Sequence, residues 1–400
     1  MKFRHYILKR RIEDVFIYPF ILLGKIIAWF KPLEQEYETF FFFPFYHTGG
    51  AEKVHAQIVQ AAGNKNAIVF FTRTSADNRF LNDFAQSGAV IKNIAAYTDN
   101  KYLYFLNLVY RGIVAAHVNR QKRKPILFNG QSNFGYKITP WIRGQIPQLE
   151  LLHSFNTFSP IRLPFLPFIH QTVMISKVRI QDHLQQYDKL EVPAQYKNCI
   201  RYIVNGIPLP ALVAPKNLNT TINILYVGRG TAEKRVHLVA QMAQKAAAQK
   251  LPVQFTFMGD VQQAIPTTLL PYCTLLGNLN DPNLIEEAYQ QAHIVVITSN
   301  TEGFPMVIEE GMARGCVILA TPVGDIPLHI KHNTNGFLFS TVLDEGVIVQ
   351  EGVDYLSTIV NNRALLAQMA EANITYARAH FGLQTFNQQY QQLIHQIRNP

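Results

Sequence analysis

Two rounds of short apolar runs, separated by helical or loop stretches, constrain the fold of this chain more than any other feature. The first round comprises residues 40–45, 67–72, 126–129, 149–153 and 172–176, and the second comprises residues 222–227, 253–258, 273–276, 294–297 and 317–320. Strands that alternate with helices form parallel sheets, because each crossover returns the chain to the same edge. We therefore predict an α/β fold of two Rossmann-like, doubly wound domains that face a central cleft at the carboxyl ends of their strands.

The boundary between the two domains is expected near residue 207. Asn205-Gly206-Ile207-Pro208 is a turn signal, and the stretch that follows is rich in Pro, Ala and Asn, as a linker would be. A length of 400 residues also exceeds what one hydrophobic core usually supports. The predicted segments are a basic and apolar amino-terminal segment over residues 1–35, a first domain over 36–207, a linker over 208–220, a second domain over 221–383 and a helix over 384–400 that packs across the hinge.

Composition limits the class of protein. Hydrophobic residues make up 48% of the chain and charged residues 16%, which is typical of a folded rather than a disordered protein. The three cysteines, Cys199, Cys273 and Cys316, are scattered and form no CxxC pair. We therefore expect neither a disulfide framework nor a zinc site, and a reducing compartment such as the cytoplasm.

The net charge of +10 is concentrated in the first half of the chain. Residues 1–200 contain 25 Lys and Arg against 13 Asp and Glu, whereas residues 201–400 contain 12 against 14. A basic half indicates a polyanionic partner, either nucleic acid or an anionic membrane. The aromatic residues lie in apolar runs rather than between basic residues, so we expect no nucleic-acid partner.

The composition of the amino-terminal segment favours an anionic membrane as the polyanionic partner. Met1–Arg11 contains five Lys and Arg and no acidic residue, and Phe16–Phe30 is apolar apart from Lys25. A helix of that length spans roughly 22 Å, less than the roughly 30 Å of a hydrocarbon core. We predict an interfacial anchor, with basic residues on lipid headgroups and Trp29 at the boundary. The alternative is a helix that packs on its own domain.

Two stretches of the second domain carry the chemistry. In the first, the strand ends at Gly228, a loop bears Arg229 and Lys234, and a helix is expected to begin near Ala232. Unpaired N–H groups at a helix N-terminus, together with two cations, favour a diphosphate.

The second stretch follows the strand at residues 294–297. Glu302 lies in the loop, Pro305 is expected at the first helical position, and Glu310 lies more than one turn inside the helix. Two carboxylates beside a phosphate site are electrostatically unfavourable unless they bind hydroxyl groups, and a carboxylate commonly holds the hydroxyls of a ribose. For Glu310 alone, an ordinary surface glutamate would be the default interpretation.

These stretches together resemble family 4 of the retaining glycosyltransferases, which have the GT-B fold. The resemblance covers roughly residues 40–340 and is strongest in the second domain. Its motifs are Val227-Gly228-Arg229 with Glu233-Lys234, then Glu302 and Glu310 with seven residues between them, Ala320-Thr321-Pro322-Val323-Gly324-Asp325-Ile326-Pro327, Asn335-Gly336-Phe337-Leu338, Gly49-Gly50-Ala51-Glu52, Leu152-His153-Ser154 and Asn205-Gly206-Ile207.

The resemblance implies a nucleotide-sugar donor and a role for each matched residue. Arg229 and Lys234 would neutralise the diphosphate and stabilise it as the leaving group. Glu310 would hold the ribose, and Glu302 and His153 would contact the transferred sugar. The remaining residues implied in donor binding are Gly49 and Gly50, whose backbone can approach the ligand closely, Gly277 and Asn278 near the base, and Phe304.

The sequence departs from the family pattern at one position and lacks a metal-binding motif. Pro305 stands where the family often has Gly, which removes one possible backbone donor. No Asp-x-Asp occurs in the chain, so we expect no metal and no cofactor besides the donor substrate. The acceptor implied is a glycan or a lipid-linked molecule, such as an intermediate of polysaccharide or lipopolysaccharide assembly, used by a cytoplasmic enzyme attached peripherally to the membrane. Alternatives are a nucleotide-sugar epimerase of the same fold and a non-catalytic, membrane-bound binding module.

Overall fold

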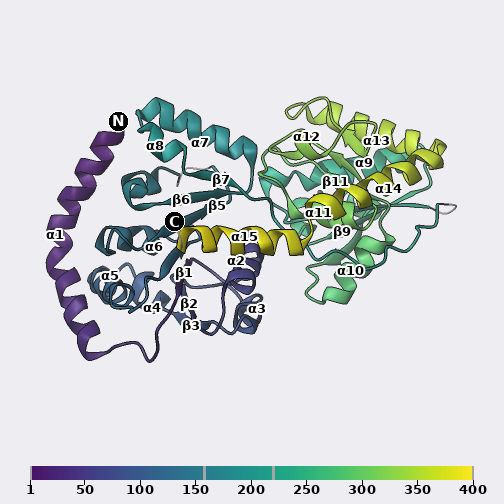
Figure 1. The fold of residues 1–400 in the computed structure, drawn as a ribbon. Helices are drawn as coiled ribbons and strands as arrows, with labels where there is room; N and C mark the ends of the chain where they lie inside the picture. The colour runs from purple at the N-terminus through teal and green to yellow at the C-terminus, as the bar shows by residue number, and fades with distance from the viewer. Residues whose placement is uncertain (1, 156–158, 219–220, 399–400) are drawn as a thin grey trace. The chain divides into compact units, whose positions relative to one another are not determined.

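The computed structural model describes residues 2–155, 159–218 and 221–398. The chain divides into two compact units, each with its own parallel sheet. Unit 1 comprises Met1–Val204 and Gln384–Pro400, and unit 2 comprises Asn205–Leu383. Figure 1 shows both units with their strands and helices labelled.

The sheet of unit 1 has seven parallel strands in the order β3-β2-β1-β4-β5-β6-β7. The interior strand β1 is buried along its whole length, because a threonine followed by four phenylalanines can be covered by helices on both faces. In the register, Phe40 of β1 lies beside Ile68 of β2 and Leu127 of β4. The strands are β1 Thr39–Phe43, β2 Ala67–Phe71, β3 Val90–Asn93, β4 Ile126–Asn129, β5 Gln148–Leu152, β6 Gln171–Met174 and β7 Ile200–Tyr202.

The helices of unit 1 include the last helix of the chain. Helix α15 hydrogen-bonds through Gln391 to the Ala61 carbonyl at 2.9 Å, and Arg398 forms an ion pair with Glu38 at 3.1 Å. The helices are α1 Phe3–Phe30, α2 Gly50–Ala62, α3 Leu81–Gln86, α4 Ala95–Thr98, α5 Tyr104–Asn119, α6 Asn133–Ile138, α7 Lys177–Leu190, α8 Ala194–Lys197 and α15 Leu383–Arg398, with 3-10 helices η1 Thr139–Trp141 and η2 Ser159–Phe168.

Helix α1 packs along α5 of its own unit, the alternative that the sequence left open. Gly24 and Gly112 permit this approach, because a Cβ at either would meet backbone atoms of the facing helix. His117 Nε2 also lies 2.9 Å from the Lys31 carbonyl. Among the residues that the structure describes, no helix combines the length and the apolar character needed to cross a membrane.

The sheet of unit 2 has six parallel strands in the order β10-β9-β8-β11-β12-β13. Its core lies between this sheet and the surrounding helices and includes Ile224, Phe257, Val296 and Leu319. The elements are β8 Ile222–Val227, η3 Ala232–Lys234, α9 Val236–Ala248, β9 Val253–Met258, η4 Gln262–Ala264, η5 Leu270–Tyr272, β10 Thr274–Gly277, α10 Pro282–Gln291, β11 Ile294–Ile297, α11 Met306–Ala313, β12 Val317–Ala320, α12 Ile326–His329, β13 Gly336–Leu338, α13 Glu345–Asn361 and α14 Arg363–His380.

The predicted α/β class with two doubly wound parallel sheets is confirmed, whereas two local predictions are wrong. Residues 232–234 form a 3-10 turn, and the α-helix begins only at Val236, because Arg235 adopts a left-handed conformation with φ 48°. Pro305 precedes α11 rather than occupying its first turn, since its ψ of 129° is extended.

Candidate functional site

The site in unit 2 lies where the strand order reverses. β8 and β11 are neighbours in the sheet, and their chain continuations run in opposite directions along it, so their carboxyl ends mark a switch point where open α/β sheets bind ligands. Several hydrogen bonds hold the loops after these strands together. The Asn300 N–H donates to the Glu233 carbonyl at 2.9 Å, and the Thr298 hydroxyl donates to the Lys234 carbonyl at 3.0 Å.

Lys234 and Glu302 meet across this switch point. The Lys234 ammonium lies 2.5 Å from Glu302 Oε1, and the two side chains are only 23% and 11% exposed. A charge-assisted hydrogen bond in a partly buried position fixes both groups more firmly than a surface ion pair would. Because an ammonium has three donors, Lys234 can hold Glu302 and an anionic ligand at the same time.

The Glu302 loop is also held from its other side. Gly324, in the turn after β12, has φ +57°, and a Cβ there would clash with the carbonyl oxygens of Glu302 and Gly303. The Asp325 N–H donates to the Gly303 carbonyl at 2.8 Å. The Ala320–Pro327 motif therefore acts through its backbone, by fixing the loop that bears Glu302.

Arg229 is placed differently from Lys234. Its side chain is 77% exposed and lies 3.8 Å from Glu233, a loose surface ion pair. Its backbone is fixed, since the Tyr226 hydroxyl donates to the Arg229 carbonyl at 3.1 Å. Burial, with Glu302 nearby, raises the pKa of Tyr226, so this donor keeps its proton. The guanidinium therefore projects into solvent at the carboxyl end of β8.

Glu310 lies inside α11, as expected, and is oriented by a residue that the sequence did not indicate. The Tyr289 hydroxyl, from α10, donates to Glu310 Oε2 at 2.7 Å. Tyr289 is buried, and its pKa is raised well above the ordinary value by burial and by the Glu310 charge. It therefore stays a donor and fixes the position of the Glu310 carboxyl group. A single tyrosine in an amphipathic helix carries no pattern that would have revealed this contact.

The three other predicted donor residues of unit 2 lie in two places. Gly277 and Asn278 line a hollow of about 430 Å³ at the ends of β9 and β10, where the Gly259 N–H donates to the Gly277 carbonyl at 2.8 Å. Phe304 is buried, with its ring stacked on His329 at 4.1 Å between centroids. Any contact of Phe304 with a donor would therefore involve its backbone.

In unit 1, His153 follows β5 and meets a second histidine that the sequence did not indicate. His153 Nε2 lies 2.9 Å from His55 Nε2, and the His55 ring, on α2, stacks on Phe43 at 4.3 Å. Burial lowers the pKa of His153 to about 4 and the pKa of His55 well below its ordinary value. Both rings are therefore neutral near pH 7, and one must donate to the other.

The Gly49-Gly50 loop leads into α2, the helix that bears His55. Gly49 has an extended backbone with φ 176°, which any residue adopts, and a Cβ on Gly50 would meet no atom within 4 Å. Glu52 lies in the first turn of α2, 3.7 Å from His47 Nε2. This carboxylate already complements the positive end of the helix, so a phosphate there would compete with it.

No metal site accompanies these groups in the part of the chain that the structure describes. Residues 2–155, 159–218 and 221–398 contain no group of three or more His, Cys, Asp or Glu side chains that could hold a metal ion.

Comparison with known proteins places the second domain in a family. The family model "Glycosyl transferases group 1" matches residues 221–353. Over these residues, about a third of the chain, the sequence therefore resembles the group 1 glycosyltransferases, in agreement with the resemblance that the motifs indicate. No curated protein matches the sequence.

Solved structures with the GT-B fold extend the likeness to both units. HepE from Anabaena, in complex with UDP and glucose, is 18% identical and has a TM-score of 0.68, with 90% of this chain and 100% of that chain covered. A glycosyltransferase from Rickettsia africae is 17% identical with a TM-score of 0.67, covering 91% and 99%. The lipopolysaccharide outer core galactosyltransferase WaaB is 14% identical with a TM-score of 0.65, covering 89% and 98%. The fold is therefore that of the GT-B glycosyltransferases.

Proposed function

We propose that this chain is a retaining, metal-independent group 1 glycosyltransferase that transfers a sugar from a nucleotide-diphosphate sugar to a glycoconjugate or polysaccharide acceptor. The observation that carries the proposal is the Lys234–Glu302 pair, which holds a cation at the switch point of a sheet. UDP is the nucleotide to test first, because the HepE structures contain UDP or UDP-glucose.

The chemistry requires charge stabilisation on the leaving group. When the bond between the anomeric carbon and the donor diphosphate breaks, negative charge develops on the phosphate oxygens. Lys234 is already fixed by Glu302, and Arg229 projects from the neighbouring loop, so both cations can stabilise that charge without a metal. Glu310, oriented by Tyr289, would accept hydrogen bonds from the ribose hydroxyls.

The resemblance implies retention of configuration, and the matched motifs offer no nucleophile for a double displacement through an enzyme-bound sugar. Glu302 is engaged by Lys234 and Glu310 by Tyr289. We therefore favour attack of the acceptor hydroxyl on the face that the diphosphate leaves. The new carbon–oxygen bond forms there, and the acceptor proton passes to a phosphate oxygen. A neutral His153 would hydrogen-bond a sugar hydroxyl.

The place of action that we propose is the cytoplasmic face of an anionic membrane. Exposed apolar side chains of α1 follow one another at spacings of three, four or seven residues and so share one face of the helix, whereas Ile21, Gly24 and Ala28 on the opposite face are buried. A continuous apolar stripe on a basic helix is typical of interfacial binding. The stripe consists of Leu8, Ile12, Val15, Phe16, Leu22, Leu23, Ile26, Trp29 and Phe30.

Two measurements on the purified protein test the proposed activity. A bound donor at 100 times its dissociation constant should add roughly 2.7 kcal/mol to the free energy of unfolding, so a thermal-shift screen of nucleotide sugars should find a ligand. Incubation with that donor should release free sugar and nucleoside diphosphate slowly without acceptor. An epimerised nucleotide sugar as the product, or the absence of both stabilisation and turnover, would contradict the proposal.

A further inference from the structure

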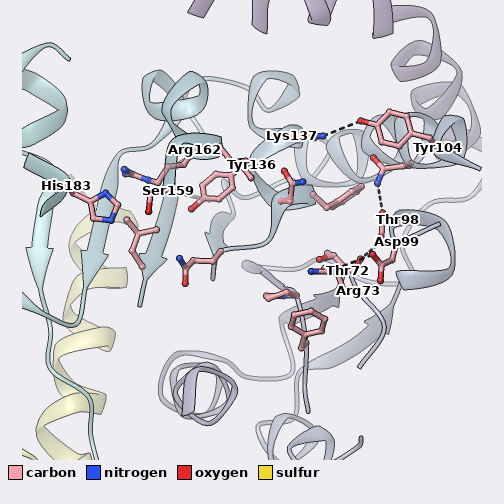
Figure 2. A pocket seen from close by; sticks show the side chains of 18 residues that line it. Thr72, Arg73, Thr98, Asp99, Tyr104, Tyr136, Lys137, Ser159, Arg162 and His183 are labelled. Atoms are coloured by element: carbon pink, nitrogen blue, oxygen red, sulfur yellow. Dashed lines mark hydrogen bonds and ion pairs between the residues drawn. The ribbon is translucent and has the colours of Figure 1, made fainter. Parts of the chain in front are cut away.

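A second cavity lies wholly within unit 1, and none of the donor-binding roles uses it. It measures about 440 Å³ and opens at the carboxyl ends of β1, β2, β4 and β5 (Figure 2). Pro44 and Phe45 follow β1 into its wall, Thr72 and Arg73 follow β2, and Asn133 begins α6. The loops at this edge of a doubly wound sheet are the usual place for a ligand.

The charged side chains that line this cavity are mostly paired with one another. Arg73 pairs with Asp99 at 3.3 Å, the only acidic residue among the lining residues. Arg162 is held by the buried Glu150, with Nε donating to Oε2 at 2.9 Å. Lys137 is the exception. In the part of the chain that the structure describes, its ammonium group hydrogen-bonds to the phenol of Tyr104 rather than to a carboxylate. The lining therefore carries a net positive charge.

Two cations converge on that phenol. The Lys137 ammonium lies 3.2 Å from the Tyr104 hydroxyl oxygen, and Arg111, which is buried, donates to the same oxygen at 2.9 Å. Figure 2 shows the tips of Lys137 and Tyr104 pointing toward one another. Burial raises the pKa of Tyr104, but the charges of Arg111 and Lys137 outweigh it, so the pKa lies below the ordinary value. Because the Tyr104 hydroxyl oxygen accepts hydrogen bonds from both cations, its own proton points away from them.

We propose that this cavity binds a phosphoryl group of the acceptor, held by the Lys137 ammonium and the Tyr104 hydroxyl. The inference rests on the proposed transferase function, because it identifies the ligand of unit 1 as the acceptor. A phosphoryl oxygen would receive one hydrogen bond from the phenol and another from the ammonium, both in the field of Arg111. Charge-assisted bonds of this kind are the stronger ones in proteins.

The neighbourhood of Tyr104 favours a phosphate carried by an apolar molecule. Tyr102 is 97% exposed, and Leu103 and Phe105 are 41% and 50% exposed. These apolar side chains adjoin Tyr104 in the chain, at the start of α5, and the same helix packs against α1. A lipid phosphate would place its apolar part on these residues, whereas a soluble sugar phosphate would leave them exposed to water.

Calorimetric titration with three probes tests the inference and separates the two sources of phosphate. Octyl phosphate carries the phosphoryl group and an apolar chain, octyl glucoside carries the chain alone, and inorganic phosphate carries the anion alone. We expect octyl phosphate to bind the full-length protein and octyl glucoside to bind much more weakly. Inorganic phosphate that bound as tightly as octyl phosphate would identify a soluble phosphate ester as the acceptor and contradict the contribution of the apolar residues.

Two variants assign the binding to the named residues. Lys137→Gln and Tyr104→Phe should each weaken octyl phosphate binding by roughly 10-fold or more, the usual effect of losing a hydrogen bond to a charged group. Lys65→Gln, at an exposed lysine of the same unit, is the matched control and should bind as the wild type does. Equal affinity of the wild type and Lys137→Gln would overturn the proposal.

The donor measurements keep this inference separate from the proposed function. If the wild-type protein binds and hydrolyses a nucleotide sugar but does not bind octyl phosphate, the phosphoryl site is wrong and the transferase assignment stands. If it binds octyl phosphate but no nucleotide sugar, the assignment of the ligand as an acceptor fails together with the transferase function, and only the anion site remains.

Discussion

The Lys234 ammonium and the Glu302 carboxylate lie 2.5 Å apart although 68 positions separate them in the sequence. The pair joins the loop after β8 to the loop after β11, at the point where the strand order of unit 2 reverses. A cation held in this way is in place before any ligand arrives, which is the condition for effective stabilisation of a developing charge.

We expect Lys234→Ala to lower turnover of the donor by about 10²–10³, the usual effect of removing one preorganised charge-stabilising group. Arg229→Ala should act in the same direction, and because Arg229 is 77% exposed it should leave the stability of the fold unchanged. Lys245→Ala, on the exposed face of α9, is the matched control. Initial rates of donor hydrolysis and urea unfolding curves would be measured together. Turnover near the wild-type level in Lys234→Ala would contradict the assignment of Lys234 to the donor diphosphate.

The Tyr289 hydroxyl gives a second, more selective test. Tyr289→Phe keeps the buried ring and removes the hydrogen bond to Glu310, so Glu310 should hold the ribose less firmly. We expect KM for the donor to rise by roughly 10-fold with kcat little changed, because one hydrogen bond to a charged group contributes about 1.5 kcal/mol or more. Steady-state kinetics with the donor varied would measure this. A fall in kcat at constant KM would place Glu310 in the chemical step instead.

Much of this fold was predictable because its strands are buried on both faces. Continuous apolar runs such as Ile222–Val227 and Ile294–Ile297 are strands with the predicted bounds. The strands that the apolar runs did not indicate, β3, β7 and β13, lie at the edges of the two sheets, and β3 and β7 are only partly buried. Edge strands need fewer apolar residues, so their sequences carry less signal.

The site was predictable to the extent that its residues belong to local motifs. Lys234 and Glu302 stand in short patterns next to strand ends, and the structure brings them together. Tyr289 and His55 orient predicted residues from other helices, and no spacing in the sequence links them to their partners. Such contacts depend on how helices pack on a sheet, which the pattern of apolar residues does not specify.

Buried histidines predict that unit 1 is sensitive to acid. Burial lowers the pKa of His183 to about 4, whereas an unfolded chain takes up that proton near pH 6.5. Below pH 6.5 the unfolded state therefore binds more protons than the folded state, and stability falls as the pH falls toward 4. The loss at pH 5 should be about 2 kcal/mol for this residue. Urea unfolding at pH 7 and pH 5 should show it, and His183→Gln should have a smaller difference. An unchanged difference would mean that His183 is not the group responsible.

We predict that donor hydrolysis survives chelation. In the proposed mechanism Arg229 and Lys234 would supply the positive charge that a divalent ion can supply to a leaving phosphate, and the chain has no Asp-x-Asp. Initial rates with and without EDTA should agree within experimental error. Loss of activity in EDTA, with recovery on addition of Mg²⁺ or Mn²⁺, would show that the leaving group is stabilised by a metal.

The apolar stripe of α1 predicts reversible binding to anionic membranes. Removal of residues 1–32 is a poor test, because it would uncover the surface of α5 around Gly112 that α1 covers. A triple variant with Phe16→Gln, Trp29→Gln and Phe30→Gln changes only side chains that are 71–79% exposed, so the fold should persist. Leu212→Gln with Leu343→Gln, at exposed positions of unit 2, is the control.

Co-sedimentation with liposomes of increasing anionic content would compare these proteins. The wild type and the control should sediment to the same extent, and the triple variant should remain largely in the supernatant. Binding of the wild type should weaken in high salt without disappearing, because screening reduces the attraction of the basic residues but not the burial of the apolar stripe. Equal sedimentation of the triple variant and the wild type would show that α1 serves only to cover α5, whereas binding abolished by salt alone would show that the aromatic residues contribute nothing to the attachment.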